Sequence, residues 1–528
     1  MQPVVTPNKR RRRSNGGGRS ARHALRQAGP VQRPVQAGML GGAYKPLTPH
    51  DLERIHQAAL EVLETVGIGD ATPEVNALAI EQGCWLGEQG RLCFPKSLVE
   101  DLIAKAAREY VVYSRNPAHA DLHVGGYRVH YATSGEAVTM YDVDQRTYRP
   151  STLIDLYDCG RLVDQLENLH QFGQMVVPTE LTDLYVHDLN VAYALAAGTQ
   201  KPCEMTFNDV DNIKPAIALF DKVLGGEGRF AERPFLSFGG CPIVSPLRFG
   251  EDNLNVLVET SKLGLINDIA IAPQAGATAP AALAGTLVQV TAEGLACLSV
   301  VNMIRPGCPM TFAIWPFISD LRTGAFSGGS GEEALVMAAA AQIGRFYDLP
   351  TSVAASMTDS KVPDAQAGYE KGITAVVAGL AGANRVLESA GMLGSLMGCS
   401  FEGLVIDNDM LGMAQRVLSG VEVTDETLSI DVIRDVALGA GHFLGEAQTL
   451  ERMESEYLYP DVADRSAPGV WQQSDPKDML ERAQEKAREL LSTHYPTYID
   501  RKIDDAIRAE FPIQLAREDM QAGNKRWG

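Results

Sequence analysis

The 528-residue chain has little cysteine and little histidine, and it lacks a long, strongly hydrophobic run. Its eight cysteines are scattered without a CxxC pair, which argues against a disulfide framework or a zinc ribbon and favours reduced thiols in a cytoplasmic protein. The longest uncharged stretch, 269–292, is rich in Ala, Gly and Thr and contains two prolines. That composition favours a helix packed on a sheet over a membrane span, so we predict no membrane insertion.

Basic residues are scarce outside the N-terminus. Residues 1–50 carry ten Lys/Arg and no acid, whereas the remainder carries 37 Lys/Arg against 66 Asp/Glu. Because residues 51–528 carry a large excess of acidic side chains, they are poorly suited to neutralise phosphates, and we predict no nucleic-acid partner. Residues 1–37 are predicted to form a disordered, solvated basic tail, the alternative being a tether to an anionic partner or membrane surface.

Phosphate-binding glycine motifs are also missing, because neither GxGxxG nor GxxxxGK[ST] occurs. Instead, short apolar segments alternate with helical patterns, and successive strands start about 30 to 45 residues apart. The predicted strands are 128–132, 172–177, 202–207, 235–241, 268–272, 309–315, 352–356 and 385–389. Eight strand–helix units predict an α/β fold, a (β/α)8 TIM barrel, ahead of an open doubly wound sheet.

Helical patterns fill the spaces between the predicted strands and extend beyond both ends of the barrel. The predicted helices lie near 151–166, 182–197, 209–224, 249–264, 278–304, 331–346, 365–381 and 402–419, with caps such as Ser151, Asn208 and Ser330. We therefore predict four parts: the tail 1–37, an N-terminal helical extension 38–127, the barrel 128–420 and a C-terminal helical extension 421–528.

Several standard chemistries lack their residues. Only His170 and His187 lie between residues 131 and 441, which disfavours Ser–His–Asp and Cys–His catalysis. No ligand-spaced Cys/His cluster exists, so we predict no zinc or other metal site. Cys241 is expected to be a buried small hydrophobic residue. Asp121–Gly126 matches the DxHxxG motif of corrinoid-binding modules, but its hairpin-like context favours coincidence.

In a barrel, chemistry sits where strands end at the carboxyl side. The predicted strand ends carry Gln274, Trp315, Lys361 and Asp364, and Asp407-Asn408-Asp409 follow further along. Each has a structural alternative: Trp315 as core, Asp364 as a helix cap, Lys361 as a solvated side chain, and 407–409 as a surface turn.

Three stretches together resemble the trimethylamine methyltransferase (MttB) superfamily of corrinoid-dependent methyltransferases. They are 272–307, Thr358–Lys371 and Gly439–Gly445, and the likeness extends over most of 45–515. Founding members of that family carry pyrrolysine, which this chain lacks, so the resemblance points to the non-pyrrolysine branch and to substrates such as glycine betaine. The family's HTL-containing stretch reads Gln448-Thr449-Leu450 here, which puts a ligand role for position 448 in doubt.

The resemblance implies methyl transfer from a quaternary amine to cobalamin carried by a separate small corrinoid protein. A quaternary ammonium leaves as a neutral amine, so neither a general acid nor zinc is required, and aromatic faces would hold the cation. The alternatives are another N-methyl donor such as trimethylamine, transfer directly to a folate, or a non-catalytic betaine-binding barrel.

The strand ends and the resemblance together give the predicted site, in a protein that we expect to be a homo-oligomer. The assignments are catalytic Asp359, Asp364 and His442; substrate-binding Gln274, Phe312, Trp315 and Gln366; and cofactor-binding Thr278, Ser360 and Lys361. Strands five to eight are expected to bring Gln274, Phe312, Trp315, Asp359 and Asp364 to one face, and His442 to reach the same mouth from the C-terminal extension.

Overall fold

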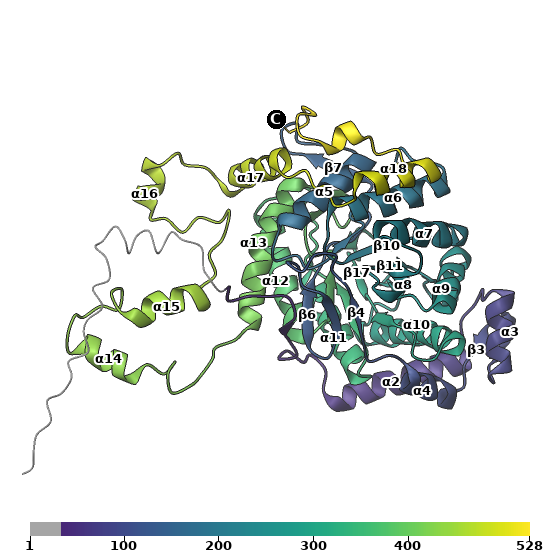
Figure 1. Ribbon diagram of the computed structural model, residues 1–528. Coiled ribbons are helices and arrows are strands. Elements are labelled where there is room, and N and C mark those ends of the chain that lie inside the picture. The colour runs from purple at the N-terminus through teal and green to yellow at the C-terminus, as the bar shows by residue number, and fades with distance from the viewer. Residues whose placement is uncertain (1–32, 528) are drawn as a thin grey trace, which may run out of the picture. The chain divides into compact units, whose positions relative to one another are not determined.

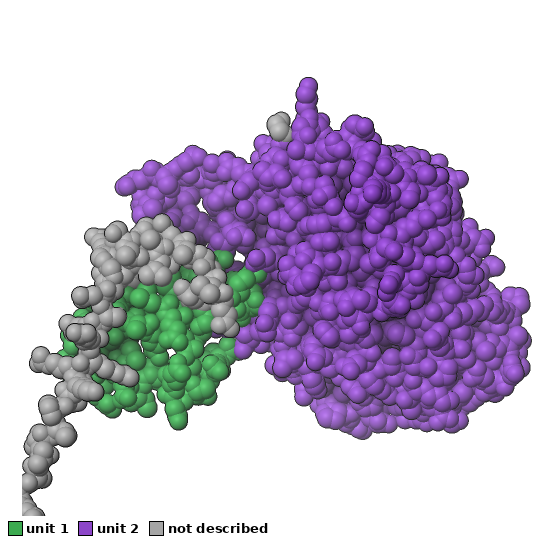
Figure 2. Space-filling model, viewed as in Figure 1, with its two compact units in different colours: residues 1–35, 420–459 green, residues 36–419, 460–528 purple. Residues whose placement is uncertain are grey.

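The computed structural model describes residues 33–527, which fall into two compact units coloured separately in Figure 2. The larger unit contains residues 36–419 and 460–527. The smaller one contains 420–459 together with 33–35. Most of the predicted basic tail, residues 1–32, lies outside the described residues, whereas Val35 near its end is buried.

A curled sheet of nine strands forms the centre of the larger unit (Figure 1). Eight of its strands run parallel, and each overlaps a predicted strand: β6 (Arg128–Tyr131), β9 (Phe172–Gly173), β10 (Cys203–Thr206), β11 (Leu236–Gly240), β14 (Asn267–Ile269), β16 (Met310–Ala313), β19 (Thr351–Ala354) and β20 (Arg385–Leu387). The short β1 (Met39–Leu40) adds antiparallel to β6.

Chain order is preserved from β9 to β20, and β20 then pairs with β6, the first of the parallel strands. On the other side of β6, a parallel bridge joins Ala132 to Gln171, just before β9. The backbone N–H of Gly173 also donates to the carbonyl of Thr133 at 3.1 Å. The two ends of the parallel series are therefore linked by hydrogen bonds.

A helix follows each parallel strand and covers the outside of the sheet (Figure 1). These helices are α5 (Leu153–Gln165), α6 (Leu184–Gly198), α7 (Ile213–Val223), α9 (Glu251–Leu263), α10 (Leu283–Ile304), α11 (Gly331–Phe346), α12 (Ala365–Ala381) and α13 (Phe401–Leu418). Ser330 caps α11 as predicted, accepting from the N–H of Glu333. Thr152 caps α5 in place of Ser151, one residue later.

Helix α10 is long and apolar enough to cross a membrane by length and composition, with a mean hydropathy of 1.6. However, 83% of that apolar window is buried inside the protein. It packs against α2, α4 and α9, so it is a core helix, as the composition of 269–292 predicted.

The N-terminal extension contains helices and two hairpins. Its helices are α2 (Pro49–Thr65), α3 (Pro73–Glu81) and α4 (Lys96–Lys105), and its strands are β2 (Trp85–Leu86), β3 (Leu92–Cys93), β4 (Glu109–Val112) and β5 (Leu122–Gly125). From β4, the Tyr110 hydroxyl bonds Thr311 at 2.5 Å and thereby reaches the sheet interior. The DxHxxG match lies in the β4–β5 hairpin, with His123 on β5.

The C-terminal stretch divides between the two units. Helices α14 (Ile430–Ala437) and α15 (Ala447–Ser455) belong to the smaller unit, whereas α16 (Pro468–Gln473), α17 (Met479–Thr493) and α18 (Arg501–Glu510) belong to the larger. Hydrogen bonds attach the part after residue 460 to the rest of the larger unit. The Asp409 carboxylate accepts from the backbone N–H groups of residues 461–463, and the Asp164 carboxylate accepts from the Tyr498 hydroxyl. Asp409 is thus a structural anchor and is buried, unlike the surface turn that was one of its predicted readings.

Two small sheets lie beyond the carboxyl ends of the parallel strands. One contains β15 (Gln274–Ala275), β17 (Phe317–Ser319) and β18 (Phe326–Ser327). The other contains β7 (Thr139–Asp142), β8 (Thr147–Pro150), β21 (Met392–Leu393) and β22 (Gly398–Cys399). They follow β14, β16, β20 and β6 in the chain, so they build walls at the end of the sheet where α/β proteins bind ligands.

Candidate active site

A cavity of about 380 Å³ opens at this carboxyl end. Residues from β10, β14, β16, β19 and β20 and from the segments after β6, β11 and β16 line it. Its polar lining residues are Ser134, Glu136, Glu204, Thr206, Asn208, Cys241, Asn253, Asp268, Ser352 and Glu388. Its aromatic ones are Phe207, Trp315 and Phe317.

The floor of the cavity is a buried ionic network centred on Arg385. The guanidinium is fully buried, donates to Glu204 Oε2 at 2.8 Å and to Gln171 Oε1 at 3.0 Å, and forms an ion pair with Asp268. Ser237 and Thr311 hydroxyls also donate to Asp268. Two carboxylates therefore share a single positive charge, and the network leaves the cavity acidic.

The wall carries two further carboxyl groups with few partners. Glu136 accepts from the Thr206 hydroxyl. Glu388 is 3% exposed, and its Oε2 has no hydrogen-bond partner within the protein. Burial, with added repulsion from Glu204 and Glu136, raises the pKa of Glu388 to about 8. Burial likewise raises the pKa of Glu136 and of Glu204, the latter despite the opposing charge of Arg385.

The backbone conformation at Glu136 and Glu388 helps to orient their carboxyl groups. Glu136 and Glu388 have φ of 49° and 62°, in the left-handed region that side chains with a Cβ rarely adopt. Leu396, on the same wall, has φ of 71°. Conformations of this kind cost about 1–3 kcal/mol each and concentrate at functional sites, where the surrounding structure enforces them.

Trp315 contributes an aromatic side chain to the lining of the cavity. Its indole Nε1 donates to the Ser352 hydroxyl at 3.3 Å, and its ring centroid lies 6.3 Å from that of Phe317. The hydrogen bond fixes the ring, so an indole ring lines the same cavity as four carboxyl groups. An aromatic face beside carboxylates is the combination that binds ammonium groups.

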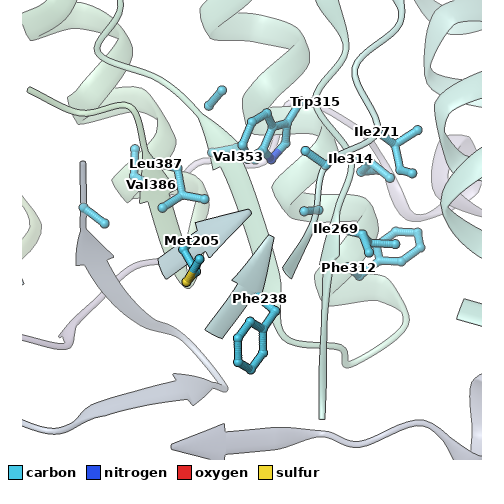
Figure 3. Packing of buried hydrophobic residues seen from close by; sticks show 14 of the residues in the cluster. Met205, Phe238, Ile269, Ile271, Phe312, Ile314, Trp315, Val353, Val386 and Leu387 are labelled. Atoms are coloured by element: carbon cyan, nitrogen blue, oxygen red, sulfur yellow. The ribbon is translucent and has the colours of Figure 1, made fainter. Parts of the chain in front are cut away.

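Phe312 does not reach this cavity. Successive residues of a strand point to opposite faces, so Ala313 faces the cavity while Phe312 faces the helices. There its ring lies 5.7 Å from that of Tyr347, which follows α11. Figure 3 shows the rings of Phe312 and Trp315 well apart. Of the five residues expected on one face, only Trp315 lines the cavity.

The other predicted residues on the β14 side hold a turn together. Gln274 Oε1 accepts from the Ser319 hydroxyl at 3.2 Å, and its backbone N–H donates to Thr278 Oγ1 at 2.8 Å. These bonds tie the β15 turn to β17. Neither residue lines the cavity, so a substrate role for Gln274 and a cofactor role for Thr278 stay predictions.

Hydrogen bonds within segment 359–366 and to its neighbours hold the predicted residues of this segment. Asp359 accepts from the Ser327 hydroxyl and the Gly328 N–H, and Lys361 Nζ donates to the Asp359 carbonyl. Asp364 caps α12, accepting from the Ala367 N–H at 3.1 Å and the Ser360 hydroxyl at 2.9 Å. Although burial opposes it, these bonds lower the pKa of Asp364. Gln366 donates to Glu370.

Two predictions about reactive side chains have different outcomes. Cys241 is exposed and lines the cavity, so the expectation of a buried residue was wrong, because Cys241 follows the last residue of β11 at the open end of the sheet. His442 lies in the smaller unit, after α14, and is exposed. Its arrival at the cavity mouth stays a prediction.

Sequence reasoning missed Glu136, Glu204, Asp268, Arg385 and Glu388. A signal was available for four of them, since parallel strands are normally apolar throughout and a charge inside one is unusual. Glu204, Asp268 and Arg385 each lie within such a strand, and Glu388 lies within the predicted strand 385–389. In the part of the chain that the structure describes, no group of three or more His, Cys, Asp or Glu side chains is arranged to hold a metal.

Comparison with known proteins gives the family. The family model for trimethylamine methyltransferase (MTTB) matches residues 10–518, so the chain belongs to this family and is a methyltransferase. The glycine betaine methyltransferase of Desulfitobacterium hafniense strain Y51 is 30% identical over 91% of this chain and 99% of that protein. The trimethylamine methyltransferase MttB of D. hafniense strain DCB-2 is 31% identical over 90% and 95%.

Among solved structures, the Methanosarcina barkeri monomethylamine methyltransferase MtmB aligns with a TM-score of 0.48. It is 13% identical, and the alignment covers 83% of this chain and 87% of that one.

Proposed function

We propose that this protein transfers a methyl group from a quaternary ammonium compound to the Co(I) centre of a separate corrinoid protein. The observation that carries the proposal is the cavity itself, where Trp315 and buried carboxyl groups converge at the carboxyl ends of parallel strands. The linkage of Ala132 to Gln171 supports reading the sheet as a closed (β/α)8 barrel, the architecture that places active sites there.

The chain's own task is to hold and aim the cation. The Trp315 ring and the wall carboxyl groups, which ionise more readily beside a cation, attract a fixed positive charge and so hold its methyl groups at the opening. A corrinoid in its Co(I) state supplies the electron pair that takes the methyl group, while the C–N bonding pair stays with the departing neutral amine. No proton moves in this exchange, so no general acid is needed.

The size of the cavity is consistent with a chain that binds the amine while a separate protein carries the methyl acceptor. About 380 Å³ accommodates a small methylated amine but not a corrin macrocycle. The acceptor must therefore meet the substrate at the opening, which agrees with a corrinoid carried by its own small protein. A cytoplasmic location and a homo-oligomeric state remain part of the proposal.

One observation favours a second substrate, a tertiary amine of the trimethylamine type. Because burial raises the pKa of Glu388 to about 8, this carboxyl group is mostly protonated at neutral pH. It can hand that proton to a neutral tertiary amine, creating an ion pair and a cationic methyl donor in one step.

A methyl-transfer screen tests the proposal. Purified protein is mixed with free cob(I)alamin and individual methylated amines, and the absorbance of methylcobalamin is followed. We expect at least one methylated ammonium to react, and Trp315→Ala to slow that reaction while Glu251→Gln, an exposed change on α9, leaves it unchanged. If no methylated amine reacts with the parent protein, the proposed function is wrong.

A further inference from the structure

We propose that the cavity selects ammonium cations that carry no acidic group and rejects betaines. This inference rests on the proposed function and specifies its substrate class. It follows from which charges face the cavity, which of them are already paired, and where the cavity has no positive group to offer.

The lining charges have one sign. Among the described residues that line the cavity, four are acidic, Glu136, Glu204, Asp268 and Glu388, and none is Lys, Arg or His. The nearby base Arg385 lies below the lining and is fully buried, with its guanidinium paired to Glu204 and Asp268. A ligand's carboxylate would therefore meet acids on the wall and no unpaired base.

The carboxyl group of Glu388 lines the cavity and is not fully paired within the protein. Glu388 Oε2 is buried without a hydrogen-bond partner in the protein, although leaving a buried carboxyl oxygen unpaired is unfavourable. A cation against the indole face of Trp315 would supply that partner. A simple tetraalkylammonium offers positive charge on every side, so it suits carboxyls that approach from β10, β20 and the segment after β6.

The groups around Glu388 make binding sensitive to pH. Glu204 and Glu136 repel its ionised form, Glu333 nearby is itself kept neutral because burial raises its pKa, and Asp268 lies behind Glu204 on Arg385. His187 and Asp188 act on Glu136 from α6. A bound cation favours the ionised carboxyl, so the Glu388 proton leaves as the cation enters. Affinity for a permanent cation should consequently rise with pH up to about 8.

The same geometry should weaken the binding of a betaine. Its carboxylate lies only a short chain away from the ammonium, so both ends must share this cavity or the anionic end must project from the opening. Like charges placed together cost several kcal/mol in a desolvated interface. The side chains that suit the ammonium thus oppose the carboxylate, and discrimination arises from repulsion as well as attraction.

Equilibrium binding tests the inference without depending on methyl transfer. Tetramethylammonium, choline and glycine betaine are titrated into the full-length protein by calorimetry between pH 6.5 and 9. We expect the first two to bind at least about tenfold more tightly than glycine betaine, with affinity rising from pH 6.5 to about 8 and levelling off above it. Repeating the titration in buffers of different ionisation enthalpy should show proton release on tetramethylammonium binding.

Two variants separate the charge effect from folding. Glu388→Gln should remove both the pH dependence and most of the preference, whereas Glu251→Gln should keep both. Glycine betaine binding as tightly as tetramethylammonium to the parent would overturn the inference, even if betaine then methylates cob(I)alamin and the proposed function holds. A cation preference without any methyl transfer would instead reject the proposed function and keep the inference.

Discussion

The segment after β19 and the cavity wall after β20 both carry acidic side chains, but only the second keeps them available. Asp359 accepts from donors of the β18 segment, and Asp364 accepts from its own loop and from the helix that it caps. Glu388 is buried with an unpaired oxygen. A carboxylate with its donors in place organises a loop, whereas a carboxyl deprived of donors is ready for a ligand. The difference separates scaffold from site, and the following changes test it.

Removing the charge beneath the cavity should have the largest effect. Arg385→Met would leave Glu204 and Asp268 buried without a counter-charge, which we expect to cost about 3–5 kcal/mol. Denaturant unfolding followed by circular dichroism measures it. Arg229→Met, which removes an exposed ion pair with Glu232, should change stability by less than about 1 kcal/mol. A variant at 385 as stable as the parent would show that the network is not the structural floor.

The two aromatic residues of the β16 region should separate folding from binding. Phe312→Ala empties a site between sheet and helices and should cost about 3–5 kcal/mol of stability. In Trp315→Ala, ammonium affinity should fall by about 0.5–2 kcal/mol for the lost cation–π contact. Thermal unfolding and calorimetric binding distinguish them. If Trp315→Ala bound ammonium ions with unchanged affinity, the indole would have no role in binding.

Glu388 should destabilise the protein at alkaline pH. Its folded-state pKa of about 8 lies above the ordinary value of 4.5, so stability is fully present below about pH 4.5 and declines as pH rises to 8. Glu388→Gln should therefore be more stable than the parent by on the order of 1–3 kcal/mol at pH 8.5, with the difference shrinking towards pH 5. Melting temperatures across pH measure this, and a constant difference would contradict it.

Asp364 should behave as a helix cap. Asp364→Ala is expected to cost about 1 kcal/mol, while Asp364→Asn, which keeps a capping oxygen, should cost little. Methyl transfer to cob(I)alamin should remain near the parent rate in both. A rate loss in Asp364→Asn that exceeds any loss of stability would restore the catalytic role predicted from sequence.

The basic N-terminus should matter least. Ten Lys/Arg without one acid in residues 1–50 are typical of a solvated extension, so deleting residues 1–32 should leave methyl transfer to free cob(I)alamin unchanged. A severe rate loss in the truncated protein would make the tail part of the site. Comparing the rates with free cobalamin and with a corrinoid protein would reveal a tethering role.

The fold was predictable because its signals are local. The parallel strands lie in short, largely apolar segments, and each helix follows at the spacing that a strand–helix unit requires, so all eight pairs could be placed within a few residues. The division of the C-terminal stretch at residue 460 was not predictable, because both parts read as charged helix. What separates them is tertiary: residues 461–463 are bound by Asp409, which lies 52 residues earlier.

The site was only partly predictable, for a physical reason. Loop polarity pointed to 359–366, yet polar loop residues are often satisfied by one another, as Ser360 and Asp364 are. Trp315 was found because it ends a strand and faces inward. Glu388 fell inside the predicted strand 385–389, where its charge was a signal, but its direction into the cavity depends on a positive φ that the sequence pattern does not predict.

The most direct test of the account is a crystal structure with tetramethylarsonium, an ammonium analogue whose arsenic scatters anomalously. We predict one strong anomalous peak inside the cavity, against the Trp315 ring and beside Glu388. A peak at Asp359 and Asp364 instead, or none in the cavity at concentrations that saturate binding, would contradict the account.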